Sequence, residues 1–418
     1  MEIIKFGTDG WRAIIGKEFT LANLLRVTEG LRCWLVQQER PEKSQPSVML
    51  GYDCRFNGKW FAEQVAVYLA QQGVKVFLSP GFVSTPMVSL ATSQRQVGVG
   101  IILTASHTPP EYLGFKVKGN YGGPAYPKII SEIESLIPSE IPVLSGTFDA
   151  LLASRQIEYY DMEALYLNHL KQSFDLAVMQ SNLRIAYDAM FGAGQRIVRK
   201  VLPQTVELHC EYNPSFLGRA PEPIERNLPE ISSVILEHSL SAGLATDGDA
   251  DRIGLFDEKG RFVDSHHILL LLIHYLHKYK GLNGKVVHTF SCTSRIRKMC
   301  ELYNLPYEVT KIGFKYIAEI MLYETVLVGG EESGGIAVTG HVPERDGIYI
   351  GLTIFEFMAK TGKTLSELID EIYSIVGTFS MYRSDLHLTE TKKQTLLAAC
   401  QNQVFQQFGS FSVQHTET

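Results

Sequence analysis

A serine and a histidine are adjacent at Ser106 and His107, shortly after the apolar run from Val99 to Leu103. An apolar run of this length that ends in a turn predicts a buried strand. A hydroxyl at the end of a strand can attack a phosphoryl group, and a neighbouring histidine can donate a hydrogen bond to an anion on that oxygen. Lys116 follows ten residues later, where the loop could fold back and bring a proton carrier. Taken alone, the stretch is more typical of a polar turn, so the other motifs decide between the two.

Three aspartates, Asp247, Asp249 and Asp251, alternate along one short segment. Side chains with this spacing can face one way, where their charges repel one another unless a cation lies among them. Hard oxygen ligands with one open side suit Mg²⁺. A solvated acidic turn and a calcium loop are the alternatives, but a calcium loop needs glycine at its sixth position, which is Arg252 here. The segment therefore favours one Mg²⁺ ion per chain.

Further polar side chains follow other predicted strands. Glu331 and Ser333 belong to the stretch GGEESGG, whose glycines let the backbone approach a ligand and whose polar pair suits vicinal sugar hydroxyls. Arg12 could hold a phosphate through two hydrogen bonds. Lys315 and His341 also lie near predicted strand ends. Each of these features alone is more typical of an ordinary turn.

Strands and helices alternate in three sets of similar rhythm, over residues 1–145, 150–256 and 257–376. The second set begins with a predicted helix over about 155–173. Repeated strand–helix–strand units predict sheets with helices on both faces, and ligands gather at the strand ends of such sheets. The rhythm then changes, which leaves residues 377–418 as a short C-terminal part.

The composition excludes several classes of function. The net charge of the 418 residues is −6 and no run of Lys or Arg occurs, so we expect no nucleic-acid partner. The longest apolar run, Ile268 to Ile273, is far too short to cross a membrane, and the N-terminus lacks an apolar signal core. Six scattered cysteines without a close pair are typical of reduced thiols, and we expect a cytoplasmic protein.

Taken in order, these stretches resemble the α-D-phosphohexomutase family, the phosphoglucomutases and phosphomannomutases. The resemblance implies an α/β fold with three similar mixed-sheet domains around a central cleft, followed by a truncated fourth domain of α+β type. The matching stretches are GTDGWR at 7–12, TASHTPPEYLGFK at 104–116, DGDADR at 247–252, GGEESGG at 329–335 and GHVPERDG at 340–347.

The resemblance also implies a role for each candidate residue. Ser106, in the first domain, would carry the phosphoryl group. Together with that phosphate, Ser106 would complete the Mg²⁺ site that the three aspartates form in the second domain. The remaining roles are Lys116 as general acid or base with His107 assisting, Arg12 and Arg252 steadying the phosphoryl group, Glu331 and Ser333 holding sugar hydroxyls in the third domain, and Lys315 and His341 positioning the substrate.

The implied activity is that of an intramolecular phosphotransferase of the isomerase class. It would interconvert hexose 1-phosphate and hexose 6-phosphate through a phosphoserine and a hexose 1,6-bisphosphate, which would also serve as activator. Glucose is the expected sugar, with mannose left open. The partner is then a small phosphosugar, and the protein is a monomer or a homodimer.

Two departures from the family pattern leave other interpretations open. Thr108 and Leu113 replace two asparagines that the family usually has, and both changes are mild. After Ser380 we find no loop of the arginine–proline–serine–glycine–threonine type, which grips the substrate's non-reacting phosphate in the family. The alternatives are therefore a sugar bisphosphate synthase, a phosphatase-like phosphoryl transferase or a non-catalytic regulatory relative.

Overall fold

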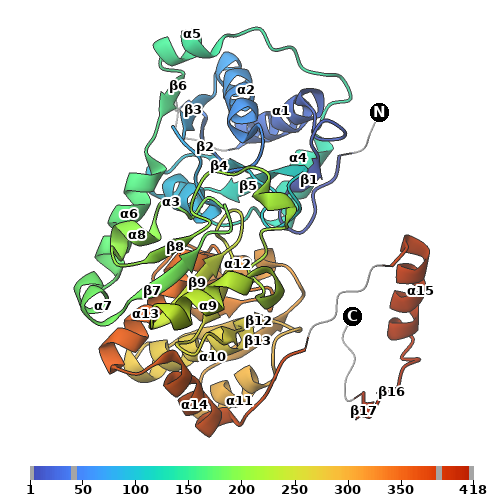
Figure 1. The fold of residues 1–418 in the computed structure, drawn as a ribbon. Coiled ribbons are helices and arrows are strands. Elements are labelled where there is room, and N and C mark those ends of the chain that lie inside the picture. The colour runs from blue at the N-terminus through green and yellow to red at the C-terminus, as the bar shows by residue number, and fades with distance from the viewer. Residues whose placement is uncertain (1–3, 39–44, 383–387, 414–418) are drawn as a thin grey trace. The chain divides into compact units, whose positions relative to one another are not determined.

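The computed structural model describes residues 4–38, 45–382 and 388–413. The chain divides into two compact units, residues 1–377 and residues 378–418. The first unit contains three sheets, each with its own helices (Figure 1). No helix within the described residues is both long enough and apolar enough to cross a membrane.

The first sheet has six strands in the order β1-β5-β4-β2-β3-β6. The strands β4, β2, β3 and β6 run parallel, whereas β5 is antiparallel to both β4 and β1. The strands are β1 Trp11–Ile14, β2 Ser47–Tyr52, β3 Lys75–Leu78, β4 Val99–Leu103, β5 Tyr112–Gly119 and β6 Ile157–Tyr159. The helices are α1 Leu21–Gln37, α2 Gly58–Gln71, α3 Thr85–Arg95, α4 Pro127–Ser135 and α5 Phe148–Ala153.

The two faces of this sheet are covered by different helices (Figure 1). Along β2, Val48 and Leu50 share a core with residues of α1 and α2. Gly51 points to the other face, where a Cβ atom would lie 2.5 Å from the Val88 side chain of α3. This alternation is what the two-residue period of a strand requires when both faces are buried.

The predicted helix over 155–173 was wrong at its start. Residues Ile157–Tyr159 form β6 and pair in parallel with β3, so the first sheet includes a strand that lies after residue 150, where the second set of elements was predicted to begin. The α6 helix then runs over Met162–Ser173, and the Asp161 carboxylate caps it by accepting the Ala164 N–H at 2.8 Å. Pairing at the open sheet edge thus overrides the local helical pattern.

The second sheet has five strands in the order β11-β10-β9-β7-β8, with β7 parallel to β8 and β9 and with β10 antiparallel to its neighbours. The strands are β7 Ile185–Asp188, β8 Val206–Leu208, β9 Ala242–Thr246, β10 Ile253–Phe256 and β11 Phe262–Val263. The further helices are α7 Leu176–Asn182, α8 Val198–Val201 and α9 Pro229–Glu237, with a short left-handed turn at Phe216–Gly218 and a 3₁₀ turn at Glu225–Asn227.

The third sheet has four strands in the order β13-β12-β14-β15, of which only β15 is antiparallel. The strands are β12 Lys285–Thr289, β13 Tyr307–Thr310, β14 Val326–Gly330 and β15 Ile336–Val338. The helices are α10 Ser265–His274 with a π-helical turn at Tyr275–Tyr279, α11 Arg295–Tyr303, α12 Phe314–Tyr323, α13 Gly347–Thr361 and α14 Leu365–Val376. The α13 helix also packs on the second sheet, because Gly351 lies against Leu244 of β9.

The second unit is small. It contains the helix α15 Glu390–Gln401 and a hairpin formed by β16 Gln407–Phe408 and β17 Phe411–Ser412. Three α/β domains with mixed sheets followed by a small helix-and-hairpin part confirm the predicted fold class.

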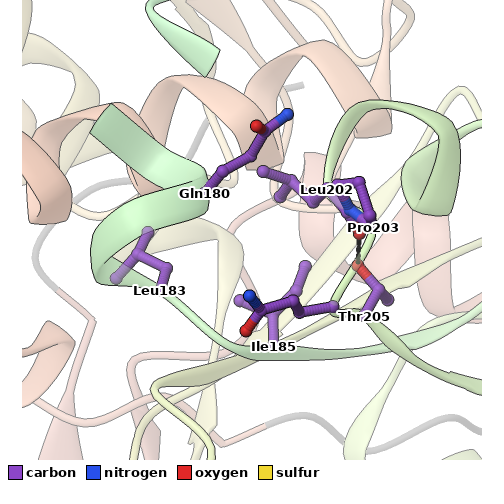
Figure 2. A pocket seen from close by; sticks show the side chains of 7 residues that line it. Gln180, Leu183, Ile185, Leu202, Pro203 and Thr205 are labelled. Carbon is purple, nitrogen blue, oxygen red and sulfur yellow. Dashed lines mark hydrogen bonds between the residues drawn. The ribbon is translucent and has the colours of Figure 1, made fainter. Parts of the chain in front are cut away.

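A small pocket of about 90 Å³ opens between α7, the start of β7 and the segment Leu202–Thr205 that leads into β8 (Figure 2). Gln180, Gln204 and Thr205 are its polar lining residues, and the Thr205 hydroxyl donates to the Leu202 carbonyl at 2.7 Å. The pocket is lined by neutral side chains, so it offers no charge to a phosphorylated ligand.

Candidate active site

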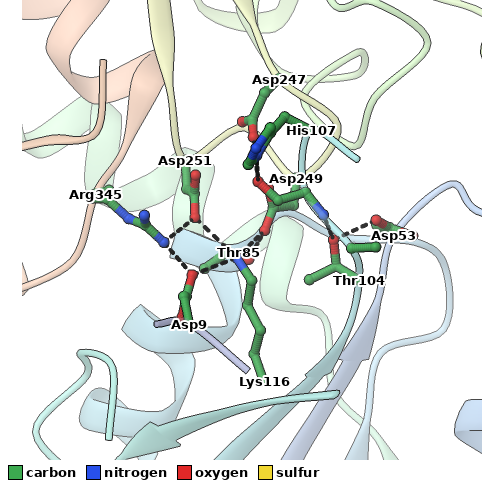
Figure 3. Close-up of polar contacts among 12 residues, drawn as sticks. Asp9, Asp53, Thr85, Thr104, His107, Lys116, Asp247, Asp249, Asp251 and Arg345 are labelled. Atoms are coloured by element: carbon green, nitrogen blue, oxygen red, sulfur yellow. Dashed lines mark hydrogen bonds and ion pairs between the residues drawn. The ribbon is translucent and has the colours of Figure 1, made fainter. Parts of the chain in front are cut away.

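The aspartate segment forms the loop between β9 and β10, where the three domains meet (Figure 3). Asp247, Asp249 and Asp251 are fully buried, and each offers an oxygen within 4.8 Å of the others. Backbone hydrogen bonds from the two other domains hold the loop. The Thr85 N–H of the first domain donates to the Asp249 carbonyl at 3.0 Å, and the Gly347 N–H of the third domain donates to the Ala250 carbonyl at 3.0 Å. The loop conformation is therefore fixed by all three domains.

The carboxylate oxygens are not all satisfied by the protein. Among the described residues, Asp249 Oδ1 and Asp251 Oδ1 are buried without a hydrogen-bond donor. Burial and the charges of Asp249 and Asp251 raise the pKa of Asp247 well above its usual value. Uncompensated oxygens in a buried cluster are costly, and a divalent cation removes that cost. The donor set of hard oxygens therefore fits Mg²⁺.

Ser106 stands at the edge of this cluster, just past the end of β4. Its Oγ donates to Asp247 Oδ2 at 2.6 Å and lies 3.3 Å from His107 Nδ1. The side chain of Thr104 accepts the Ser106 N–H at 2.9 Å. The serine and the aspartate that it contacts are 141 positions apart in the chain, yet the fold brings them together.

Burial and the positive charges of Arg252 and Arg12 lower the pKa of His107 to about 2. The folded chain therefore keeps this ring neutral, whereas the unfolded chain takes up a proton below about pH 6.5. Neutral His107 can accept a hydrogen bond from Ser106 Oγ or donate one to it, depending on its tautomer.

We expect His107 to make stability fall as the pH falls. Because the pKa of His107 is depressed in the folded state, its contribution to the free energy of unfolding is fully present above pH 6.5. Below pH 6.5 this contribution is lost, at up to about 1.4 kcal/mol per pH unit. Urea unfolding of the unphosphorylated chain at pH 7.5, 6.5 and 5.5 would measure it. The His107→Asn variant should lose less stability over this range than the wild type. Parallel loss in both proteins would contradict the neutral ring.

Lys116 of β5 is fully enclosed by carboxylates. Its Nζ lies 2.7 Å from Asp249 Oδ2, 3.1 Å from Asp251 Oδ2 and 2.8 Å from Asp9 Oδ2. Burial alone would lower the pKa of Lys116, but these three carboxylates raise it above its usual range. Burial alone would likewise raise the pKa of Asp249, but the ammonium of Lys116 holds it below its usual value. These three carboxylates therefore hold Lys116 in its cationic form.

Two residues of this cluster, Asp9 and Arg345, were not predicted as site residues, although each belongs to one of the stretches quoted above. Arg345 Nη2 donates to Asp251 Oδ2 at 2.6 Å and also to Asp9 Oδ2 (Figure 3). Arg345 Nη1 lies 3.7 Å from Glu331 Oε2. Asp9 thus bridges Lys116 and Arg345 across two domains. A guanidinium in the stretch GHVPERDG was the signal that could have pointed to this contact.

The predicted sugar-binding loop contacts the aspartate loop. Gly335 forms a backbone bridge with Arg252, and the Gly313 N–H donates to Glu331 Oε1 at 3.0 Å. Burial raises the pKa of Glu331. Ser333 and Lys315 are both half-buried, and Lys315 Nζ lies 5.6 Å from the ring centre of its neighbour Tyr316.

The other predicted residues have different surroundings. Arg252 is mostly buried and its Nη1 lies 3.8 Å from Glu222. Arg12 of β1 is half-buried and lines a groove of about 440 Å³ beside Trp11. The side chain of His341 is 1% exposed, with Nε2 lying 3.0 Å from Asp346 and Nδ1 lying 2.9 Å from His169 Nε2. Both of its ring nitrogens therefore have partners within the protein.

Three family models match the chain: phosphoglucomutase/phosphomannomutase α/β/α domain I over residues 4–142, domain II over 164–260 and domain III over 264–376. A phosphoglucosamine mutase of Limosilactobacillus reuteri is 29% identical over 381 residues, which cover 89% of this chain and 82% of that protein. A phosphoglucomutase/phosphomannomutase of Thermococcus kodakarensis is 28% identical over 372 residues, which cover 88% and 80%.

A solved structure from Thermus thermophilus, described as a phosphomannomutase, superposes with a TM-score of 0.83. It is 35% identical in sequence, and the match covers 90% of this chain and 84% of that one. The class of protein is therefore that of the phosphotransferases that act as isomerases. The chain belongs to the α-D-phosphohexomutase family, which confirms the prediction from its motifs.

Proposed function

We propose that this protein interconverts hexose 1-phosphates and hexose 6-phosphates, with Ser106 carrying a phosphoryl group between the two positions. The observation that carries this proposal is the contact of Ser106 Oγ with Asp247 Oδ2, 2.6 Å long, at the edge of a buried carboxylate cluster with unsatisfied oxygens. A nucleophilic oxygen beside a cation site is the arrangement that phosphoryl transfer needs.

Asp247, Asp249, Asp251 and the oxygen on Ser106 would hold one Mg²⁺ ion. When bound, Mg²⁺ neutralises charge on the phosphoryl oxygens. Arg12 and Arg252 are proposed to steady the same group from the protein side, since both lie close enough to His107 to affect its pKa. Arg345 and Lys116 fix the aspartates, because each pairs with Asp251.

The transfer balances without another reactant. The 6-hydroxyl oxygen of a hexose 1-phosphate attacks phosphorus, the bond from phosphorus to Ser106 Oγ breaks, and a hexose 1,6-bisphosphate forms. One proton leaves the sugar hydroxyl and one reaches Oγ, a transfer that we assign to Lys116 with His107 assisting. Return of the 1-phosphoryl group to Ser106 leaves the 6-phosphate, so added bisphosphate should activate the unphosphorylated protein.

We assign the sugar contacts to Glu331 and Ser333 and the positioning of the substrate to Lys315 and His341. Because both ring nitrogens of His341 have partners within the protein, His341 would act through its neighbours and not by touching the sugar. Glucose is the proposed sugar, with mannose as a second substrate. The relatives named above differ in their sugars, so glucosamine 1-phosphate belongs in the same comparison. Coupled assays of kcat/KM on the three 1-phosphates test the proposal. A preference for glucose supports it, whereas turnover of glucosamine 1-phosphate alone would replace the proposed sugar.

Magnesium should stabilise the folded chain by binding the aspartate loop. At a free concentration of 100 times its Kd, a ligand adds about 2.7 kcal/mol to the free energy of unfolding. We expect thermal melts with Mg²⁺ and with EDTA to show this difference in the wild type and not in Asp247→Asn. Asp161→Asn is the control, because Asn also caps a helix and α6 lies outside the loop. Equal stabilisation of Asp247→Asn and the control would contradict the assigned site.

A further inference from the structure

The conformation of the nucleophile needs support from its surroundings. Ser106 has φ = +53°, a left-handed conformation that non-glycine residues rarely adopt and that persists where neighbouring groups over-determine it. The residue that supplies this support was not among those predicted from the sequence. It is Arg55, which lies just after β2.

Arg55 binds four backbone carbonyls of the serine loop. Its Nη2 donates to the carbonyls of Ser106 at 2.7 Å and Thr108 at 2.5 Å. Its Nη1 donates to those of Pro109 at 2.7 Å and Tyr112 at 3.0 Å. A planar guanidinium presents its donors in a fixed fork, so four simultaneous contacts define the path of the loop from residue 106 to residue 112.

A second set of contacts orients Arg55 itself. Asp53 Oδ1 accepts the Arg55 N–H at 2.9 Å, and Asp53 Oδ2 lies 3.4 Å from Arg55 Nε. The Thr104 hydroxyl donates to the same carboxylate while its oxygen accepts the Ser106 N–H. The side chains of Arg55 and Asp53 are both 0% exposed. Arg55 therefore cannot touch a substrate and acts through the loop.

The second domain closes over this arrangement. The ring of Phe216 lies under the Arg55 guanidinium, with 5.1 Å between the guanidinium carbon and the ring centre. Phe216 is 2% exposed and sits in a left-handed turn with φ = +46°. In the aspartate loop, a Cβ atom at Gly248 would lie 2.4 Å from the Ser106 carbonyl oxygen. The nucleophile loop is thus enclosed between Arg55 and the aspartate loop.

We infer that Arg55 is the positioning residue for Ser106: its guanidinium fork locks the serine loop in the reactive conformation, and Phe216 seals that fork from the second domain. This inference rests on the proposed function, because it concerns the reactivity of the same serine. Lysine at this position keeps the charge but cannot supply four donors in a plane. A displacement of about 1 Å at a reacting atom costs about 100-fold in rate.

The test compares Arg55→Lys with Arg26→Lys in the full chain. Arg26 is the matched control, since it is also buried in the first domain and donates to a backbone carbonyl, that of Pro138, at 2.7 Å. For Arg55→Lys we expect kcat for glucose 1-phosphate to fall by about 100-fold while KM changes by less than about threefold. The single-turnover rate of transfer from phosphorylated Ser106 should fall in step with kcat, and Arg26→Lys should retain both rates.

Phe216→Leu keeps the test open where Arg55→Lys fails to fold. This substitution removes the ring under the guanidinium but leaves all four carbonyl contacts available. We therefore expect a smaller effect than for Arg55→Lys, a fall in kcat of about 10-fold at unchanged KM. A folded Arg55→Lys or Phe216→Leu protein with the transfer rate of Arg26→Lys would overturn the inference. If the wild type itself forms no phosphoserine, the proposed function fails instead, which separates the two results.

Discussion

Replacing Ser106 with alanine should lower kcat for hexose phosphate isomerisation by about 10⁴-fold or more. The hydroxyl is the atom that we propose to carry the phosphoryl group, and its Oγ reaches the carboxylate cluster through Asp247 Oδ2, at 2.6 Å. Intact-mass spectrometry should show one phosphate on the wild type after incubation with a hexose bisphosphate and none on Ser106→Ala. A coupled assay of glucose 1-phosphate conversion measures the loss of rate.

Ser135→Ala provides the control for this substitution, because Ser135 lies at the end of α4 and its exposed hydroxyl donates to the neighbouring Glu132 carbonyl. It should keep both the activity and the phosphate. Full activity in Ser106→Ala would contradict the phosphoserine mechanism, whatever the phosphorylation state of the wild type.

Replacing Lys116 with methionine should damage both stability and catalysis. The side chain is 1% exposed and pairs with Asp9, Asp249 and Asp251, so its removal leaves buried carboxylates uncompensated. Breaking a buried ion pair by removing one partner costs about 3–5 kcal/mol. Loss of a proton donor costs about 10²–10⁴ in rate. Urea unfolding and kcat measurements at saturating substrate test the two effects.

Lys118→Met separates stability from chemistry. Lys118 is equally buried on the same strand, but its Nζ lies 2.7 Å from Glu344 and contacts the cluster only through Asp9 at 3.7 Å. We expect a comparable loss of stability but a fall in kcat of less than about twofold per folded molecule, since no aspartate of the loop loses its partner. Equal rate losses in the two variants would assign Lys116 a structural role alone.

The strands that carry the site could be predicted from the sequence because each is a continuous apolar run. Val99–Leu103 and the flanks of the aspartate loop are β4, β9 and β10 in the structure. Their apolar residues are buried on both faces, and the polar residues that follow them lie at strand ends. The local pattern is sufficient here because a strand that is buried on both faces is apolar at consecutive positions.

The contacts of Arg345 and Arg55 could not be predicted in the same way. Arg345 and Asp9 are 336 positions apart, and Arg55 and Ser106 are 51 apart. A spacing of this kind has no period, so only the tertiary packing, within one domain for Arg55 and between domains for Arg345, decides which side chains meet. The stretch GHVPERDG shows the consequence: we singled out His341, whereas Arg345 contacts Asp251.

The most direct measurement follows the phosphoryl group itself. The chain is labelled with radioactive phosphate on Ser106 and mixed, in a single turnover, with unlabelled glucose 1-phosphate and Mg²⁺. We expect the label to leave the protein and to appear first in a hexose 1,6-bisphosphate and then in hexose 6-phosphate. Label that stays on Ser106 while the sugar phosphate is isomerised would contradict phosphoryl transfer through this serine.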